Sequence, residues 1–377
     1  MTPFLAAVVI AAAAFLAAAG AVSAAGVDKE AKKDLAAIYA ARSDLQQCFR
    51  SSDWKAIPTS RTKGLTDLEA WARAYGYREY PQQLAAYAPA NLPVDPPVTA
   101  AKPPPVLAPR ATGRTPVLRD GASFNFSRLT ADAVFVVDAA SREVLLAHNS
   151  RTVRPIASIT KLMTAMVMLD RQSPSSRLMV LSPDDEVGGA RLQVPVGTKL
   201  SLTDLFNAMI IGSANNAAHA CARSTGMGVP EFVAAMNAKA ASCGLASTRF
   251  TDPTGIDTGN VSTAQEVAAL GLEAFENYAE IERSASTASY DIPVADQVHR
   301  IRNTDGLLTD ESNGLVVTGG KTGYLNESKW NLVVRMSDGA HRPVVVVILG
   351  SDTEKLLFRE AASAAKWAWQ NYTWVRK

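Results

Sequence analysis

Residues 155–170 read PIASITKLMTAMVMLD and place Ser158 and Lys161 three positions apart at the start of an apolar helical pattern. Positions i and i+3 lie on one face of a helix, so we expect these two side chains to project side by side from its first turn. An apolar stripe beside them is formed by Leu162, Met166 and Leu169. A helix that begins with two polar residues on one face predicts that its N-terminus opens into a cleft.

This spacing alone carries little information, because serine is a common helix cap and lysine a common surface residue. Two further motifs follow along the chain. Ser213-Ala214-Asn215 stands at the junction of two helical patterns, and Lys321-Thr322-Gly323 ends a strand-like run over 315–320. Each is weak by itself. The three in this order, each in a suitable context, form the signature of class A β-lactamases and penicillin-binding proteins.

The sequence around the motifs narrows this resemblance. DPTG at 252–255, STA at 262–264, NTDGLL at 303–308 and GKTGY at 320–324 accompany the stretch around Ser158. Together they resemble the D-alanyl-D-alanine carboxypeptidase and endopeptidase group of low-molecular-mass penicillin-binding proteins, over roughly 127–372. The resemblance implies an α+β transpeptidase fold.

The chemistry of the two lysines can be argued from the residues. Ser158 is a weak nucleophile until a base accepts its proton, and Lys161 can be that base only if desolvation and a nearby cation lower its pKa. Lys321 is the candidate cation. The start of the helix beneath Ser158 favours developing negative charge.

The resemblance implies the remaining roles. Ser213 relays a proton toward the leaving amine together with Lys321, and Asn215 orients the substrate amide. Thr322 and Lys321 receive the carboxylate that follows the scissile bond, on a substrate-binding strand that includes Gly323. The backbone N–H groups of Ser158 and Tyr324 form the oxyanion hole.

Peptidoglycan stem peptides are therefore the expected substrates, with β-lactams as covalent inhibitors. A β-lactamase is disfavoured, because no Glu-x-x-Leu-Asn segment lies between Asn215 and Lys321. A non-hydrolytic β-lactam sensor or cell-wall-binding protein remains an alternative.

The motifs do not separate a D-Ala-D-Ala carboxypeptidase from a D-Ala-diaminopimelate endopeptidase. The chain ends at Lys377 without an appended β-domain or amphipathic anchor, which favours the endopeptidase.

Composition excludes other classes of function. The 377 residues carry a net charge of +2, with no concentrated basic run, so no nucleic-acid partner is expected. No phosphate-binding glycine motif is present, and the four histidines lack metal-ligand spacing. Each histidine is expected at the surface or as a satisfied core residue. The site is predicted to need neither metal nor cofactor.

Four segments are expected along the chain: a signal peptide over 1–24, a helical segment over 25–87, a proline-rich linker over 88–125 and the catalytic domain over 126–377. The first predicts export to the periplasm, with 4–25 as a membrane anchor if it is not cleaved. The aromatic helical segment either packs on the protein itself or contacts a cell-wall or protein partner.

Cys221 and Cys243 either pair with each other or remain buried thiols, and Cys48 makes the number of cysteines odd. The oligomeric state is left open.

Within the catalytic domain, patterning predicts the elements. The region over 177–300 is expected to be mostly helical, as an insertion into an antiparallel sheet built from both ends of the domain. Strands are expected over 133–138, 143–147, 314–318, 330–336 and 343–349. Helices are expected over 202–211, 214–224, 230–242 and 355–372.

Overall fold

The computed structural model describes residues 107–110, 112–171, 174–339 and 342–376. The predicted signal peptide, the helical segment, Cys48 and the linker up to residue 106 lie outside these described residues. Among the described helices, none combines the length and the hydropathy needed to cross a membrane.

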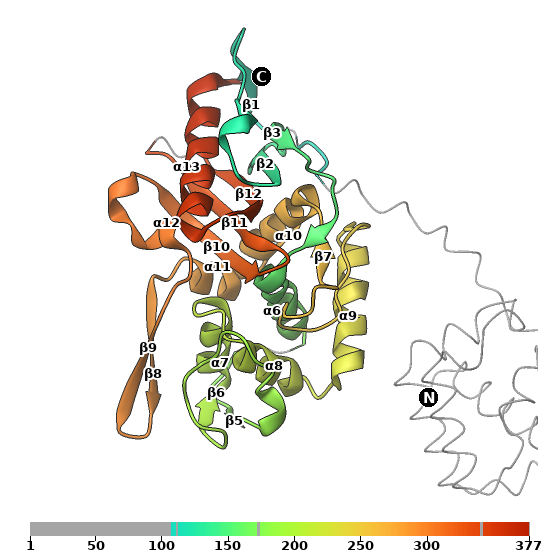
Figure 1. The fold of residues 1–377 in the computed structure, drawn as a ribbon, viewed down its shortest axis with the longest axis vertical. Coiled ribbons are helices and arrows are strands. Elements are labelled where there is room, and N and C mark those ends of the chain that lie inside the picture. The colour runs from blue at the N-terminus through green and yellow to red at the C-terminus, as the bar shows by residue number, and fades with distance from the viewer. Residues whose placement is uncertain (1–106, 111, 172–173, 340–341, 377) are drawn as a thin grey trace, which may run out of the picture. The chain divides into compact units, whose positions relative to one another are not determined.

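The domain is organised around a five-stranded sheet in the order β10-β11-β12-β2-β3 (Figure 1). Each neighbouring pair is antiparallel. The two strands at one edge come from the start of the domain and the other three from its end, so the predicted α+β layout is confirmed. The strands are β2 (Ala133–Asp138), β3 (Val144–His148), β10 (Val316–Leu325), β11 (Lys329–Ser337) and β12 (Val344–Ser351).

The sheet is covered on both faces, which follows from the sequence of its central strands. Every residue of β12 is buried. Because successive side chains point to opposite faces, Val345 and Val347 join one hydrophobic core while Val344 and Val346 join a second. The first core contains the helical insertion, and the second contains the C-terminal helix α13 (Glu354–Asn371).

The helical insertion lies between β3 and β10 in the sequence and packs below the sheet in Figure 1. Its helices are α6 (Thr160–Leu169), α7 (Leu202–Ile210), α8 (Asn215–Ser224), α9 (Val229–Ser242), α10 (Ala264–Asn277) and α11 (Ala279–Ala285). Of these, α7, α8 and α9 begin and end within one residue of the predicted positions. Short helices are η3 (Phe126–Arg128), η4 (Ala157–Ile159), η5 (Pro183–Asp185), α12 (Gly306–Thr309) and η6 (Glu311–Asn313).

Helix α6 is buried on all sides rather than along a single stripe. All residues from Thr160 to Met168 are buried, because α8, α9 and α10 all pack against this helix. An apolar helix enclosed in this way is a core element. Only its first turn, with η4 before it, reaches a polar site.

Two strands at the ends of the domain were not predicted. Residues Arg114–Leu118, assigned to the linker, form β1, which pairs antiparallel with β13 (Tyr372–Arg376). The folded domain therefore begins before residue 126, and the last helix gives way to a strand. Both segments contain residue types that favour strands, namely Val117, Trp374 and Val375. The strand pattern of β1 is interrupted by Pro116, and that of β13 follows directly on the helix α13.

The region over 177–300 also contains more strand than predicted. Strands β8 (Ser289–Val294) and β9 (Gln297–Arg302) form a hairpin that projects from the body in Figure 1. Pro293 weakens the strand signal, and the turn residue Ala295 has φ +50°, which usually selects glycine or asparagine. Shorter pairs are β4 (Arg154–Pro155) with β7 (Val261–Ser262), and β5 (Leu178–Val180) with β6 (Lys199–Ser201).

The question left open for two cysteines is answered by the fold. Cys221 is a buried free thiol on α8, and Cys243 is a partly buried free thiol just after α9. Burial raises the pKa of both thiols. They behave as small core residues.

Candidate active site

Ser158 lies in η4, at the point where the chain turns into α6. The residue before it, Ala157, has φ +49°, a left-handed conformation that alanine rarely adopts. Ser158 itself is partly exposed, whereas its neighbours in the turn are buried. The backbone therefore presents one side chain to solvent from an otherwise buried segment, and strain of this kind is typical of functional sites.

Two glycines allow other segments to close against this turn. A Cβ added at Gly255, whose φ is +84°, would lie 2.0 Å from the Ala157 carbonyl oxygen. A Cβ added at Gly323 would lie 2.7 Å from the Ile156 oxygen and 3.0 Å from the Ser158 nitrogen. Any side chain at either position would push its segment away from Ser158. The strand with the Lys-Thr-Gly motif thus runs directly beside the Ser158 N–H group.

Lys161 is fully buried and holds the centre of a hydrogen-bond network. Its Nζ lies 2.8 Å from Ser158 Oγ, 2.7 Å from Asn215 Oδ1 and 2.6 Å from the Thr254 carbonyl oxygen. The last two atoms can only accept hydrogen bonds, so two N–H groups of a neutral amine satisfy them. The lone pair of that amine is then available for the Ser158 hydroxyl proton.

The electrostatic surroundings favour this neutral amine. Desolvation by burial and the positive charge of Lys321 lower the pKa of Lys161 well below its usual value, while Asp252 opposes them. Both effects act in the direction expected from the sequence, and the role of Lys161 as the base stays a prediction.

Lys321 and Ser213 form a second contact on the other side of the site. Lys321 is buried, and its Nζ donates to Ser213 Oγ at 2.8 Å and to the Thr322 carbonyl at 3.1 Å. Burial lowers the pKa of Lys321 to about 7, with Asp305 acting in the opposite direction. Ser213 has φ +57°, a left-handed conformation like that of Ala157, so a strained backbone presents a hydroxyl group here as well. Thr322 Oγ1 lies 2.6 Å from Thr304 Oγ1.

Asn215 begins α8 and joins Lys161 to the loop that contains Gly188 and Ala190. Its Oδ1 accepts from Lys161, while its Nδ2 donates to the Gly188 carbonyl at 2.7 Å. Its backbone N–H donates to the Ala190 carbonyl, also at 2.7 Å. A Cβ at Gly189 would lie 2.6 Å from Asn215 Nδ2, so this loop packs directly on the carboxamide.

The structure places the predicted residues in two ways. Ser158, Lys161 and Asn215 share one network, and Ser213, Lys321 and Thr322 share another. Tyr324 differs, because its ring is half exposed, lies 4.5 Å from the Trp330 ring and donates its hydroxyl to Asn326. The role expected for Tyr324 concerns its backbone N–H, and that role stays a prediction.

Sequence reasoning missed the support that the DPTG stretch gives to Lys161. Asp252 accepts hydrogen bonds from the backbone N–H groups of Thr254, Gly255 and Asp257 and from Asn260 Nδ2. It thereby fixes the loop whose Thr254 carbonyl binds Lys161. The motif was visible in the sequence, but a backbone carbonyl has no sequence signal of its own.

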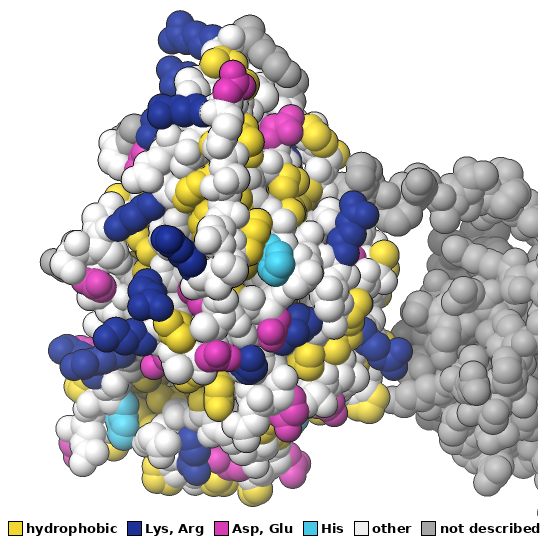
Figure 2. Space-filling view, turned by 45° about the horizontal axis from the view of Figure 1, so that its top comes forward, with side chains coloured by type: hydrophobic (Ala, Val, Ile, Leu, Met, Phe, Trp, Pro, Cys, Tyr) yellow, Lys and Arg dark blue, Asp and Glu magenta, His cyan; other side chains and the backbone are white. Residues whose placement is uncertain are grey.

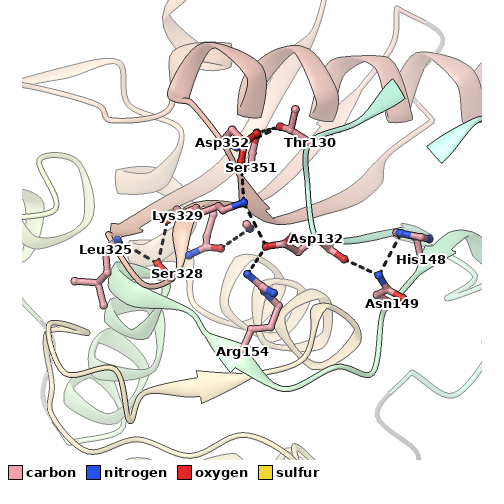
Figure 3. Close-up of polar contacts among 12 residues, drawn as sticks. Thr130, Asp132, His148, Asn149, Arg154, Leu325, Ser328, Lys329, Ser351 and Asp352 are labelled. Atoms are coloured by element: carbon pink, nitrogen blue, oxygen red, sulfur yellow. Dashed lines mark hydrogen bonds and ion pairs between the residues drawn. The ribbon is translucent and has the colours of Figure 1, made fainter. Parts of the chain in front are cut away.

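A charged cluster links Arg154, which lies shortly before Ser158 in the chain, to Lys329, which follows the turn between β10 and β11 (Figure 3). Arg154 binds Asp132 at 2.5 Å, and Lys329 lies 4.0 Å from Asp132 and 2.7 Å from Asp352. A Cβ at Gly350 would lie 2.3 Å from Asp132 Oδ2. Partly exposed pairs of this kind add little stability. Their effect is to hold two segments near the same carboxylate, Asp132: the strand β4, which contains Arg154, and the start of β11, which contains Lys329.

Comparisons with known proteins agree with this geometry. A family described as D-alanyl-D-alanine carboxypeptidase matches residues 121–353. A D-alanyl-D-alanine endopeptidase of Haemophilus influenzae is 36% identical over 54% of this chain and 69% of its own length. One from Escherichia coli is 31% identical over 69% of this chain and 83% of its own. A solved D-alanyl-D-alanine carboxypeptidase of Mycobacterium tuberculosis has a TM-score of 0.60 at 27% identity, covering 67% of this chain and 96% of that one.

The motifs, the fold and these relatives lead to one assignment. The chain belongs to the D-alanyl-D-alanine carboxypeptidase family and is a serine DD-peptidase.

Proposed function

We propose that this protein cleaves D-alanyl peptide bonds in peptidoglycan stem peptides through an acyl-enzyme on Ser158. The observation that carries this proposal is the triple contact of Lys161 Nζ with Ser158 Oγ, Asn215 Oδ1 and the Thr254 carbonyl. A nucleophile within hydrogen-bond reach of an oriented, neutral base is the arrangement that covalent catalysis needs.

Acylation then proceeds in balanced steps. Lys161 accepts the hydroxyl proton while Ser158 Oγ forms a bond to the carbonyl carbon of the D-alanyl residue. The N–H groups of Ser158 and Tyr324 stabilise the oxyanion. When the C–N bond breaks, the proton held by Lys161 is delivered to the leaving amine by way of Ser213, which lies 2.8 Å from the Lys321 amine, so both lysines return to their starting protonation states. Hydrolysis of the ester by water releases the peptide acid and returns the proton to Ser158.

The site also suggests how the substrate is oriented. Lys321 and Thr322 are positioned together on β10 and would bind the carboxylate that follows the scissile bond. Asn215 can donate its second amide hydrogen to the substrate backbone, since the first is used on Gly188. Gly323 lets this strand lie close to the Ser158 turn.

We favour a D-Ala-diaminopimelate endopeptidase over a carboxypeptidase. Relatives described as D-alanyl-D-alanine endopeptidases are 31–36% identical, whereas those described as carboxypeptidases are 25–30% identical. Both substrates present a carboxylate beside the scissile amide, so the motif residues serve either reaction. Export of the protein to the periplasm and a cell-wall or protein partner for residues 25–87 remain part of this proposal.

The experiment is a parallel incubation with purified cross-linked muropeptide dimers and with monomeric pentapeptides, analysed by chromatography. Cleavage of dimers supports the endopeptidase, and loss of the terminal D-alanine alone would make the protein a carboxypeptidase. Labelling by fluorescent penicillin without turnover of either peptide would favour the sensor and overturn the peptidase proposal.

A further inference from the structure

The loop over residues 186–192, which packs on the Asn215 carboxamide, forms neither helix nor strand. Its middle contains two adjacent glycines, Gly188 and Gly189, with φ +86° and +67°, and residues 188–191 are all exposed. Backbone of this kind can adopt many conformations when nothing supports it. Another group must therefore hold the loop in the one conformation that reaches Asn215.

Asn216, the second residue of α8, binds both ends of this loop. The residue is only 1% exposed. Its Oδ1 accepts a hydrogen bond from the Leu192 N–H at 2.9 Å, and its Nδ2 donates to the Leu192 carbonyl and to Glu186 Oε1, each at 3.1 Å. The ion pair between Arg191 and Glu186 is partly exposed and adds little stability. The buried carboxamide of Asn216 is thus the main anchor of the two ends.

Between these ends, the loop supplies the contacts that orient Asn215. The Gly188 carbonyl accepts a hydrogen bond from Asn215 Nδ2, and the Ala190 carbonyl accepts one from the Asn215 N–H, each at 2.7 Å. The donor and acceptor ends of a carboxamide have nearly the same shape, so its partners decide which way it faces. The Gly188 carbonyl selects the orientation in which Asn215 Oδ1 faces the Lys161 amine.

We propose that Asn216 is a positioning residue for acylation. It holds the 186–192 loop, and this loop keeps the Asn215 carboxamide turned toward Lys161. The inference rests on the proposed function, because it assumes that Asn215 serves the base and the substrate amide. Asn216 itself acts on the reaction only through the loop and its neighbour in the chain.

Loss of the Asn216 carboxamide is expected to free the loop without unfolding the domain. The segment just before the loop is held to α8 by other groups. The buried Asp185 accepts hydrogen bonds from the Ser182 N–H at 2.8 Å and from Arg223 Nη2 at 2.7 Å. An effect of Asn216→Ala should therefore be confined to the loop and to the carboxamide beneath it.

The test is a double-mutant cycle on the rate of Ser158 acylation by fluorescent penicillin, with wild type, Asn216→Ala, Asn215→Ala and the double variant. Asn216→Ala alone should slow acylation about 10- to 100-fold, because misplacing a positioning group by about 1 Å has effects of that size. In the Asn215→Ala background the same change should alter the rate less than about twofold, because the carboxamide on which it acts is gone. Equal fold-losses in both backgrounds would show a merely structural role and overturn the inference, as would wild-type acylation by Asn216→Ala.

Asn313→Ala is the matched control. Asn313 also bridges backbone groups, accepting from the Leu315 N–H at 2.7 Å and donating to the Leu307 carbonyl at 2.8 Å, but in the segment before β10. It should label at the wild-type rate even if its melting temperature falls. Slowing equal to that of Asn216→Ala would show that losing any such bridge slows acylation, and would overturn the inference. Failure of the wild type to label at Ser158 would instead overturn the proposed function.

A second pair of variants covers the case in which Asn216→Ala does not fold. Gly189→Ala places a Cβ 2.6 Å from Asn215 Nδ2 and displaces the loop directly. Gly197→Ala has a similar left-handed backbone, φ +88°, with no described atom within 4 Å of its Cβ. Gly189→Ala should slow acylation about tenfold, an effect that vanishes in the Asn215→Ala background, and Gly197→Ala should label like the wild type. Equal labelling rates in the two glycine variants would contradict the role of the loop.

Discussion

At the scale of single residues, Lys161 explains how an ordinary serine becomes a nucleophile. Its amine has two partners that can only accept hydrogen bonds and one hydroxyl that can give up a proton. The Ser-x-x-Lys spacing predicted the neighbouring side chains, and the Lys-Thr-Gly motif predicted the second cation. The Thr254 carbonyl was not predicted, because its role arises from the path of the backbone.

Replacing Lys161 with methionine tests its role as the base. Methionine fills a similar volume but accepts no proton, so the rate of acylation by fluorescent penicillin should fall about 10²–10⁴-fold. Lys199→Met, at an exposed lysine on β6, should label at the wild-type rate. A Lys161→Met protein that melts like the wild type and still labels within a few-fold of its rate would show that another group accepts the proton.

At the scale of elements, the site exists because two glycine-bearing segments lie against η4. The central strands were predictable from their continuous β-branched sequence, and α7, α8 and α9 from their periodicity. The β8–β9 hairpin and the β1–β13 pair were not, because prolines, an alanine in a left-handed turn and a directly adjoining helix hid the strand pattern. The close packing of the DPTG loop on the Ser158 turn could not be predicted either, because it depends on which atoms surround Gly255 in the folded chain.

Gly255→Ala should displace the DPTG loop from the Ser158 turn. Its Cβ would lie 2.0 Å from the Ala157 oxygen and its φ is +84°. We expect a loss of about 2–4 kcal/mol of unfolding free energy, from the left-handed conformation together with the clash. Acylation should slow at least tenfold, because the Thr254 carbonyl moves away from Lys161.

Gly314→Ala is the control for backbone conformation alone. Gly314 has φ +68° and no atom within 4 Å of an added Cβ. It should lose about 1–2 kcal/mol in denaturant unfolding and acylate at the wild-type rate. Equal acylation rates in the two variants would show that the close approach at Gly255 is not needed for the site.

At the scale of the whole molecule, the catalytic domain includes residues that the sequence assigned to a linker. Strand β1 pairs with β13, and β13 is fixed to the sheet by Trp374 Nε1 donating to Asp138 Oδ2 and by the Tyr372 hydroxyl donating to the Leu145 carbonyl. Figure 2 shows charged side chains of both signs spread over the visible face of the domain, without one continuous basic surface. Because the net charge is only +2, the substrate is expected to be selected by contacts with the active-site residues and not by overall charge.

Two N-terminal truncations test this domain limit. A fragment that begins at residue 107 should melt like the full chain, whereas one that begins at 126 should melt several degrees lower, because β13 loses its partner strand. Both should label with penicillin at similar rates, since the active-site residues found in the described part of the chain all lie at or after Ser158. Equal melting temperatures would show that β1 adds nothing to stability.

The most direct test of the account is to map the covalent adduct. Wild-type protein and Ser158→Ala are incubated with penicillin, digested and analysed by mass spectrometry. One penicilloyl group is expected on the wild-type peptide containing Ser158 and none on the variant. An adduct on Ser213, or labelling of Ser158→Ala at the wild-type level, would contradict it.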